Sequence, residues 1–396
     1  MNLYFVKIMV LSFFNRALVT ISILFIVLIS TSAVNAQLYQ TKAEQALLVD
    51  AETGTVLFSK NADVRIPPAS LAKIMTVEVV FNQLNTGKLQ LEENFYVSEN
   101  AWRKGGASSG GSTMFAKLNS EIPLGDLIRG VVIQSANDGS IVIAEGLAGS
   151  EAAFANLMNE RARRIGLNNS NFLNSTGLPA EGQYVSIRDL AKLSRHVISE
   201  YPEYYKYYNE PSFLWNKIEQ RNRNPLLSMN IGADGMKTGF TEASGYAIVG
   251  SAVRDGRRLV AVLSGMTSKK QRAEEARKIL DWGFRAFEKV SIFDQGEILG
   301  QASVYGGRKS GVDVVGKGPV EIYLPIGNRD KLKARIAYTG PILPPVEEGD
   351  KIAKLQIWIG DELSQEIDLY AAETVEKGGL QRQAVDALKE LLFGWL

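Results

Sequence analysis

A serine and a lysine three residues apart are the residues of this chain best suited to chemistry. Ser70 and Lys73 form the only Ser-x-x-Lys pair in the sequence, directly after two prolines and an alanine. Positions i and i+3 share a helix face, so the Lys73 amine can lie beside the Ser70 hydroxyl and accept its proton. The chain has no cysteine and a single histidine, His196. A thiol nucleophile is therefore excluded, and a Ser-His-Asp triad or a His-rich metal site would depend on one imidazole.

For Lys73 to act as a base near neutral pH, its pKa must fall from about 10.4 to about 7 or 8. That shift corresponds to roughly 3 to 5 kcal/mol against the charged amine. Burial, a helix N-terminus and a second nearby cation all act in that direction. The alternative is a serine that caps a helix and a lysine in solvent, since about one such pair is expected by chance in a chain of this length.

Lys237 is the candidate for the second cation, in the triplet Lys237-Thr238-Gly239. A similar triplet, Lys309-Ser310-Gly311, lies in the C-terminal part of the chain, far from Ser70 in sequence. Lys237 is favoured because it precedes two β-type runs, Gly245 to Val253 and Arg257 to Leu263. Gly239 would let a substrate approach the strand edge closely.

A Ser-x-Asn turn is the candidate for a third element. The triplets of this type are Ser59-Lys60-Asn61, Ser98-Glu99-Asn100, Ser135-Ala136-Asn137 and Ser228-Met229-Asn230. Only the triplet at Ser135 joins an apolar helical run, Leu127 to Ile133, to the start of another helical pattern, Asp138 to Leu147. A turn of this kind can direct both polar side chains into a cleft.

Charge and the N-terminus bear on partners and location. Lys and Arg number 44 against 43 Asp and Glu, so no basic excess exists to neutralise a phosphate backbone, and nucleic acid is not expected as a partner. Basic residues precede an apolar run, Ala17 to Ser30, and Val34 and Ala36 stand at the two positions that signal peptidase reads. A signal peptide at residues 1–36 is expected, with an uncleaved membrane anchor as the alternative. Either places the bulk of the protein outside the cytoplasm.

The pattern of the remaining chain changes near residue 289. Residues 37–288 combine short β-type runs with long helical patterns, the last of which runs from Gln271 to Phe287. The other expected helices are Ser70 onward, Leu124 to Ile133, Asn137 to Leu147, Glu151 to Ile165 and Ile187 to Ile198. Residues 289–376 contain short β-type runs between Gly and Pro turns. Two domains are therefore expected, an α+β domain that carries the motifs and a smaller β-rich one.

The tail, residues 377–396, has a pattern of its own. From Leu380 to Leu396 apolar residues recur at helical spacing, with charged and amide residues on the other face. A helix of about 17 residues spans only about 25 Å, so it is expected to lie in a membrane interface rather than cross the bilayer. The alternative is a helix docked on a domain surface.

The order Ser70-x-x-Lys73, Ser135-x-Asn137 and Lys237-Thr238-Gly239 resembles the motif set of penicillin-binding proteins and class A β-lactamases. The chain resembles in particular the low-molecular-mass penicillin-binding proteins that are D-alanyl-D-alanine carboxypeptidases. Further stretches that resemble signatures of this family are Gly182-Gln183-Tyr184, Asp234 to Thr241, Ala243 to Tyr246 and Asp281 to Phe284. The resemblance implies a β-lactamase/DD-peptidase-like α+β domain, in which an antiparallel sheet flanked by helices adjoins a helical subdomain, followed by a small all-β domain.

The resemblance also implies roles for individual residues. Ser70 would be the acylated nucleophile, Lys73 its base, and Ser135 the relay that carries the proton to the leaving D-alanine. Substrate binding would fall to Asn137, Lys237, Thr238, Gly239, Phe240 and Arg272. The backbone amides of Ser70 and Phe240 would form the oxyanion hole, and Arg272 would bind the terminal carboxylate. A solvated helix face is the alternative for Arg272, the role of Arg223 stays open, and no metal or other cofactor is expected.

Two positions depart from a familiar member of the family, because Phe240 and Thr176 stand where that relative has histidine. Only the backbone role of Phe240 therefore carries over. The glycine-rich stretch Gly105 to Ser112 borders the active site in the resemblance, as a lid over the acyl-enzyme or as a passive loop. His196 lies in a helical pattern without a motif, which indicates a structural role.

The sequence thus predicts a serine carboxypeptidase that removes the terminal D-alanine from peptidoglycan stem peptides and is acylated by β-lactams. It would act at the periplasmic face of the inner membrane, held peripherally through Leu380 to Leu396. A DD-endopeptidase or a β-lactamase with the same Ser-Lys site is the alternative, although a β-lactamase needs neither the β-rich domain nor the tail. A wall-binding module with a decayed site is the non-enzymatic alternative, which the intact motifs disfavour.

Overall fold

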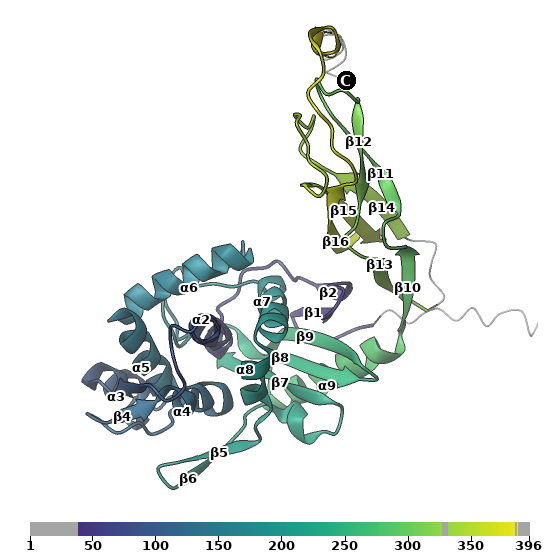
Figure 1. Cartoon of the computed structure of the whole chain (residues 1–396). Coiled ribbons are helices and arrows are strands. Elements are labelled where there is room, and N and C mark those ends of the chain that lie inside the picture. The colour runs from purple at the N-terminus through teal and green to yellow at the C-terminus, as the bar shows by residue number, and fades with distance from the viewer. Residues whose placement is uncertain (1–38, 327–331, 385, 387–396) are drawn as a thin grey trace, which may run out of the picture. The chain divides into compact units, whose positions relative to one another are not determined.

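The computed structural model describes residues 39–326, 332–384 and 386. The N-terminal two thirds of this range are built on a five-stranded antiparallel sheet with the strand order β2-β1-β9-β8-β7 (Figure 1). The strands are β1 Gln45–Asp50, β2 Val56–Lys60, β7 Ala233–Thr241, β8 Gly245–Arg254 and β9 Arg257–Met266. The motif Lys237-Thr238-Gly239 lies in β7, which is an edge strand. One side of this motif is therefore not paired to another strand of the sheet.

Helices cover both faces of the sheet. Residues 247–252 of β8 are all buried, which requires cover on each face because side chains alternate between them. Helix α9 (Lys269–Arg285) packs on β8 and β9, and α7 (Ile187–Glu200) packs on β9 and β1. The helix predicted to extend to Phe287 ends earlier, because Phe287 begins strand β10 and pairs with Pro325.

A second group of helices packs beside the sheet and shares its core. These helices are α2 Lys73–Asn85, α3 Glu99–Gly105, α4 Leu124–Arg129, α5 Asn137–Ala148 and α6 Glu151–Ile165. The first eight residues of helix α5 are all buried, the polar Asn137, Asp138 and Ser140 among them. Such a helix is stable only when neighbours surround it, and α3, α4 and α6 pack against it.

Two predicted helices begin or end differently from the expectation. Ser70 lies in a short 3₁₀ turn, η1 (Ala69–Ala72), and the α-helix α2 begins at Lys73. The helix predicted from Leu124 to Ile133 changes after Arg129 into a single π turn, η3 (Gly130–Gln134), which ends where Ser135 adopts a left-handed conformation with φ of 66°. The 3₁₀ turn contains Ser70 and the π turn ends immediately before Ser135; short 3₁₀ and π segments are often found at functional sites.

The C-terminal part of the chain has its own β-rich core. It contains a five-stranded antiparallel sheet with the order β11-β12-β16-β15-β14 and a separate pair, β10 with β13. The bounds are β10 Phe287–Phe293, β11 Ile298–Ser303, β12 Gly311–Val315, β13 Val320–Pro325, β14 Leu332–Ala337, β15 Lys351–Ile359 and β16 Glu362–Ala371. The predicted change from mixed to β structure is confirmed.

The two chain ends fall largely outside the described residues. The predicted signal peptide at residues 1–36 lies entirely outside them, and of the tail helix only residues 380–384 and 386 are described, all helical. Within the described ranges no single helix has the length and apolarity to cross a membrane. Helices α5 and α6 reach that composition only as a pair, and they are bent by 83° relative to each other.

Candidate active site

The hydroxyl of Ser70 and the amine of Lys73 lie next to each other, as the sequence predicts. Lys73 Nζ is 3.2 Å from Ser70 Oγ, 2.8 Å from Asn137 Oδ1 and 2.6 Å from the backbone carbonyl oxygen of Thr176. The last two oxygens can only accept hydrogen bonds. A neutral amine that donates its two N–H groups to them directs its lone pair towards Ser70. In that state the serine hydroxyl becomes the donor, which is the arrangement needed for proton transfer.

The surroundings of Lys73 favour the neutral amine. Lys73 is only 1% exposed, and this burial, together with the positive charge of Arg223, lowers its pKa to about 7. The negative charge of Asp138 acts in the opposite direction but is a smaller influence. At pH 7 a substantial fraction of Lys73 is therefore deprotonated and able to act as a base.

The turn before helix α5 supplies two further polar groups. Asn137 is the first residue of α5, and its backbone nitrogen donates a hydrogen bond of 2.7 Å to the Ser112 carbonyl oxygen. Ser135 is 2% exposed, and its hydroxyl is buried without a hydrogen-bond partner among the described residues. A buried hydroxyl without a hydrogen-bond partner lowers the stability of the folded protein. Such a group close to Asn137, a hydrogen-bond partner of Lys73, is typical of a side chain that hydrogen-bonds a substrate.

The edge strand β7 lies directly against the Ser70 turn. A Cβ atom placed on Gly239 would be 3.2 Å from Ala69 Cβ and from Leu71 Cγ, and 3.4 Å from the backbone nitrogen of Ser70. A side chain at this position would require a shift of a few tenths of an ångström, so glycine favours the close approach of the strand to the nucleophile. Thr238, the preceding residue, is 6% exposed.

Three cations without a carboxylate partner converge on the same region. Within the described ranges no Asp or Glu forms an ion pair with Lys237, Arg223 or Arg272. Burial lowers the pKa of all three, and for Lys237 the charges of Lys73, Arg223 and Arg272 lower it further. The Nε of Arg272 is also buried without a partner. Such a cluster is suited to an external anion, and a carboxylate fits a guanidinium well.

The side chain of Phe240 is the most exposed of the predicted substrate-binding residues that have a side chain. It is 50% exposed, and its ring lies on that of Tyr246, with 4.3 Å between centroids and an interplanar angle of 33°. Tyr246 is the cross-strand neighbour of Phe240 in β8, and the Arg272 guanidinium lies 5.7 Å from the Tyr246 ring centroid. Of the substrate-binding residues predicted from sequence, only Phe240 presents a large apolar side chain to solvent.

The segment around Thr176 contributes more than the sequence indicated. Asn174 Oδ1 accepts hydrogen bonds from Thr176 N, Thr176 Oγ1 and Gly177 N, at 3.2, 2.9 and 2.7 Å. This Asx turn fixes the Thr176 carbonyl that contacts Lys73. A Cβ on Gly177, whose φ is 76°, would be 1.8 Å from the Ala69 carbonyl oxygen. The sequence Asn-Ser-Thr-Gly at residues 174–177 is typical of a turn. It does not show that this turn packs against the segment that contains Ser70.

The glycine-rich stretch from Gly105 to Ser112 borders these residues. A Cβ on Gly105 would be 2.3 Å from the Asp138 nitrogen, and Ser112 Oγ accepts a 2.5 Å hydrogen bond from Arg223 Nη1. Asp138 is fully buried and accepts hydrogen bonds from the backbone nitrogens of Met114 and Ala116. The stretch is therefore joined to both the Asn137 turn and Arg223.

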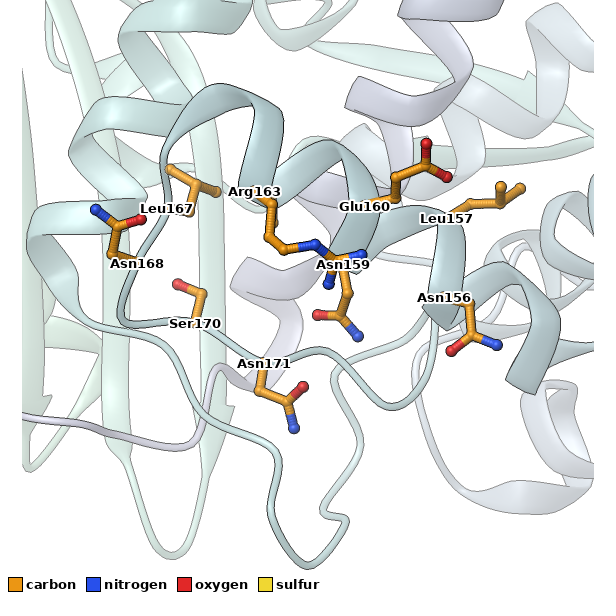
Figure 2. Close-up of a pocket in the computed structure, with 10 residues that line it drawn as sticks. Asn156, Leu157, Asn159, Glu160, Arg163, Leu167, Asn168, Ser170 and Asn171 are labelled. Carbon is orange, nitrogen blue, oxygen red and sulfur yellow. The ribbon is translucent and has the colours of Figure 1, made fainter.

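His196 lies in α7 apart from these motifs. Its Nε2 is 3.2 Å from Glu78 Oε1, and its ring meets that of Tyr201 edge-on. No group of three or more His, Asp or Glu side chains suited to a metal ion occurs in the described part of the chain. A polar cavity of about 590 Å³ lies between α6 and the residues that follow it, and Asn156, Asn159, Arg163 and Asn171 are among its lining residues (Figure 2). None of the predicted site residues lines it.

Comparison with known proteins agrees with this geometry. Residues 30–268 match the family profile described as D-alanyl-D-alanine carboxypeptidase, and residues 287–377 match that of the penicillin-binding protein 5 C-terminal domain. The D-alanyl-D-alanine carboxypeptidase DacC of Escherichia coli is 37% identical over 352 residues, which cover 88% of each chain. DacA of Haemophilus influenzae is 37% identical over 319 residues, 80% of this chain and 81% of that one.

Solved structures show the same relationship. The crystal structure of penicillin-binding protein 5 from Haemophilus influenzae superposes with a TM-score of 0.71 and 35% identity, covering 86% of this chain and 99% of that chain. Penicillin-binding protein D2 from Listeria monocytogenes, in an ampicillin-bound form, gives a TM-score of 0.54 at 27% identity, covering 62% of this chain and 99% of that one. The fold and the matches define a serine DD-peptidase with an added β domain. The chain belongs to the D-alanyl-D-alanine carboxypeptidase family of low-molecular-mass penicillin-binding proteins.

Proposed function

We propose that Ser70 carries the D-alanyl-D-alanine carboxypeptidase activity of this family, releasing the terminal D-alanine of peptidoglycan pentapeptides through an acyl-enzyme. The observation that supports this assignment best is the contact set of Lys73. Its amine lies 3.2 Å from the Ser70 hydroxyl and is also held by two oxygens that can only accept. Among the described residues no other lysine amine forms a hydrogen bond with a serine hydroxyl.

In the proposed acylation step, neutral Lys73 takes the proton of Ser70, and Ser70 Oγ attacks the carbonyl carbon of the penultimate D-alanine. The C–N bond to the last residue breaks, and the leaving nitrogen receives a proton that Ser135 would relay; its buried hydroxyl without a hydrogen-bond partner supports this role. Water then attacks the ester carbonyl, Ser70 regains its proton, and the shortened peptide leaves. Ser70 and Lys73 thereby return to their starting protonation states, and no step requires a cofactor.

The remaining residues are assigned to substrate binding. Asn137 would hold the peptide backbone of the donor, and Lys237, Thr238 and Arg272 would face the terminal carboxylate, where the unpaired cations gather. The backbone amides of Ser70 and Phe240 would stabilise the oxyanion. The close approach of Gly239 to Ser70 N supports this, because it brings the β7 edge against the nucleophile.

The assignment is tested with the purified protein and two reagents, a fluorescent penicillin and a diacyl-D-alanyl-D-alanine peptide. We expect stoichiometric labelling by the penicillin and catalytic release of D-alanine, and both are expected to vanish in Ser70→Ala. Ser59→Ala is the matched control, since Ser59 belongs to another Ser-x-Asn triplet in β2, and it is expected to behave as the parent. Labelling that persists in Ser70→Ala, or rapid turnover of the penicillin, would contradict the proposal.

Family membership implies an exported protein that acts on the cell wall. We propose further that residues 1–36 are removed as a signal peptide and that Leu380 to Leu396 hold the protein on the outer face of the inner membrane. The amphipathic pattern of the tail supports this proposal. Deleting the tail should move the protein from the membrane fraction to the soluble fraction, whereas continued membrane association of the truncated protein would contradict it.

A further inference from the structure

The side chains of Phe240 and Tyr246 lie close to the candidate active site but have no role in the proposed mechanism. Only the backbone of Phe240 is used in the oxyanion hole, yet its ring is half exposed and lies on Tyr246 at 4.3 Å. Aromatic faces of this kind bind apolar groups well. The residue next to it, Gly239, packs against Ser70 N. The exposed ring therefore stands one residue from the point where β7 meets the nucleophile.

The two faces of β7 locate the ring pair relative to the bound substrate. Side chains alternate along a strand, so Gly239 points towards the Ser70 turn, whereas Thr238 and Phe240 share the opposite face. That face is the one covered by α9, because Gly250, the partner of Met236, lies near Leu280. Arg272 of α9 reaches the Tyr246 ring at 5.7 Å. Thr238 and Arg272, the proposed carboxylate ligands, thus flank the ring pair.

A C-terminal D-residue bound by its carboxylate carries its side chain on the adjacent carbon atom. Thr238 and Phe240 lie two positions apart on one face of β7, a separation of about 7 Å, so a carboxylate held by Thr238 and Arg272 would bring that side chain towards the ring of Phe240. D-alanine has only a methyl group and leaves most of the exposed ring uncovered. A larger apolar side chain would cover the ring and exclude water from it.

We infer that Phe240 and Tyr246 form an apolar subsite for the leaving residue, so that the enzyme also releases C-terminal D-residues with large apolar side chains, such as D-leucine and D-phenylalanine. The inference rests on the proposed assignment of Ser70 and the carboxylate ligands. The bond broken and the proton transfers are those already given, and only the side chain of the leaving amine differs. Phe240 is in this account a residue that determines specificity.

The test uses three diacyl peptides that end in D-Ala-D-Ala, D-Ala-D-Leu and D-Ala-D-Phe. For each enzyme variant the readout is the kcat/KM for release of the last residue, expressed as the ratio of D-Phe to D-Ala. We expect Phe240→Ala to lower this ratio about 5-fold, the size of one lost aromatic contact. Phe240→Leu, which keeps an apolar side chain, is expected to give an intermediate ratio.

The control is Tyr96→Ala, because Tyr96 is an aromatic residue of similar exposure, 55%, on strand β3 (Asn94–Tyr96). Its ratio is expected to equal that of the parent. A parent that releases D-alanine but whose ratio is unaltered in Phe240→Ala would overturn the subsite and leave the proposed function intact. A general loss of rate in Phe240→Ala, equal for all three peptides, would also overturn it, since it would reflect the oxyanion hole alone. Release that persists in Ser70→Ala would overturn both proposals.

Discussion

Helix α2 carries two buried charged residues five positions apart, and they differ in what surrounds them. Lys73 is 1% exposed and Glu78 is fully buried. Glu78 is bound by Arg161 at 2.5 Å, by His196 at 3.2 Å and by the Tyr201 hydroxyl at 3.1 Å. Lys73 has no carboxylate at ion-pair distance within the described ranges, and its neighbours Asn137 and Thr176 supply neutral oxygens.

The causes of the pKa shifts of Glu78 and Lys73 differ because Glu78 has charged partners and Lys73 has neutral ones. Burial raises the pKa of Glu78, but hydrogen bonds and charges from His196 and Arg161 outweigh it, so the carboxylate stays ionised with a lowered pKa. For Lys73 nothing outweighs burial, and the pKa falls to about 7. A buried charge that is fully paired is a structural element, whereas a buried amine left without a counter-charge is suited to proton transfer.

The largest difference between the two sites should appear when each charge is removed. Lys73→Met is expected to lower the rate of acylation by a β-lactam about 10³-fold, the usual range for loss of a general base. Its free energy of unfolding should change little, because the buried amine that is removed has no counter-charge to stabilise it. Stopped-flow acylation and urea unfolding of the same preparation measure both quantities. An acylation rate within tenfold of the parent would show that Lys73 is not the base.

Glu78→Gln should show the opposite behaviour. Removing one partner of a buried ion pair leaves Arg161 without its carboxylate and is expected to cost about 3 kcal/mol of stability. Acylation by the folded protein should stay within about threefold of the parent, since Glu78 touches no proposed substrate-binding residue. Urea unfolding measures the first effect. A strong loss of acylation with unchanged stability would mean that the two sites are not distinct.

The position of the Thr176 carbonyl can be tested through the neighbouring glycine. Gly177→Ala puts a methyl group into the Ala69 carbonyl, which displaces a ligand of Lys73 and is expected to lower acylation about 100-fold. Gly182→Ala is the matched control, because its φ is 84° and its nearest contact is Leu173 Cδ1 at 3.9 Å. It carries similar backbone strain without the clash, so its acylation rate should remain close to that of the parent. Equal effects in the two variants would contradict the assignment.

The smallest effect concerns pH and stability. The folded-state pKa of Glu78 is below its ordinary value of 4.5, so its ionised form stabilises the protein above that value. This contribution falls as the pH drops below about 4.5 and is lost once the folded-state pKa is passed. The stability difference between the parent and Glu78→Gln should therefore shrink from pH 7 to pH 4 in urea unfolding. A difference that grows on acidification would contradict the stated direction.

Much of the site follows from sequence because its motifs are local. Ser70 and Lys73 lie three residues apart, and the helical patterns on either side of Asn137 distinguish its Ser-x-Asn triplet from the three others. In the structure Lys73 contacts both Ser70 and Asn137. The hydrogen bond from Lys73 to the Thr176 carbonyl oxygen could not be predicted, because every residue has a backbone carbonyl and the sequence does not mark which one is used. Its position depends on how a turn formed by Asn174 closes against Ala69, a contact between segments about 100 residues apart.

The fold was predictable to a similar degree. Helix α6, the buried helix α5 and the β-rich C-terminal part follow from hydrophobic periodicity. The π turn before Ser135 and the 3₁₀ turn that holds Ser70 do not, since apolar spacing cannot distinguish an α-helix from these shorter turns. Tertiary packing around the site selects them; the 3₁₀ turn contains Ser70, and the π turn ends immediately before Ser135.

The most direct test of the account is the pH dependence of Ser70 acylation by a β-lactam between pH 5.5 and 9. Because the base must be deprotonated, the rate should rise about tenfold per pH unit below pH 7 and level off above it, with a midpoint near the pKa of about 7 for Lys73. His196→Asn should keep that midpoint, since the only histidine contacts Glu78 and not Ser70. A rate that is independent of pH, or that keeps rising to pH 9 as for an ordinary lysine, would contradict the neutral-amine mechanism.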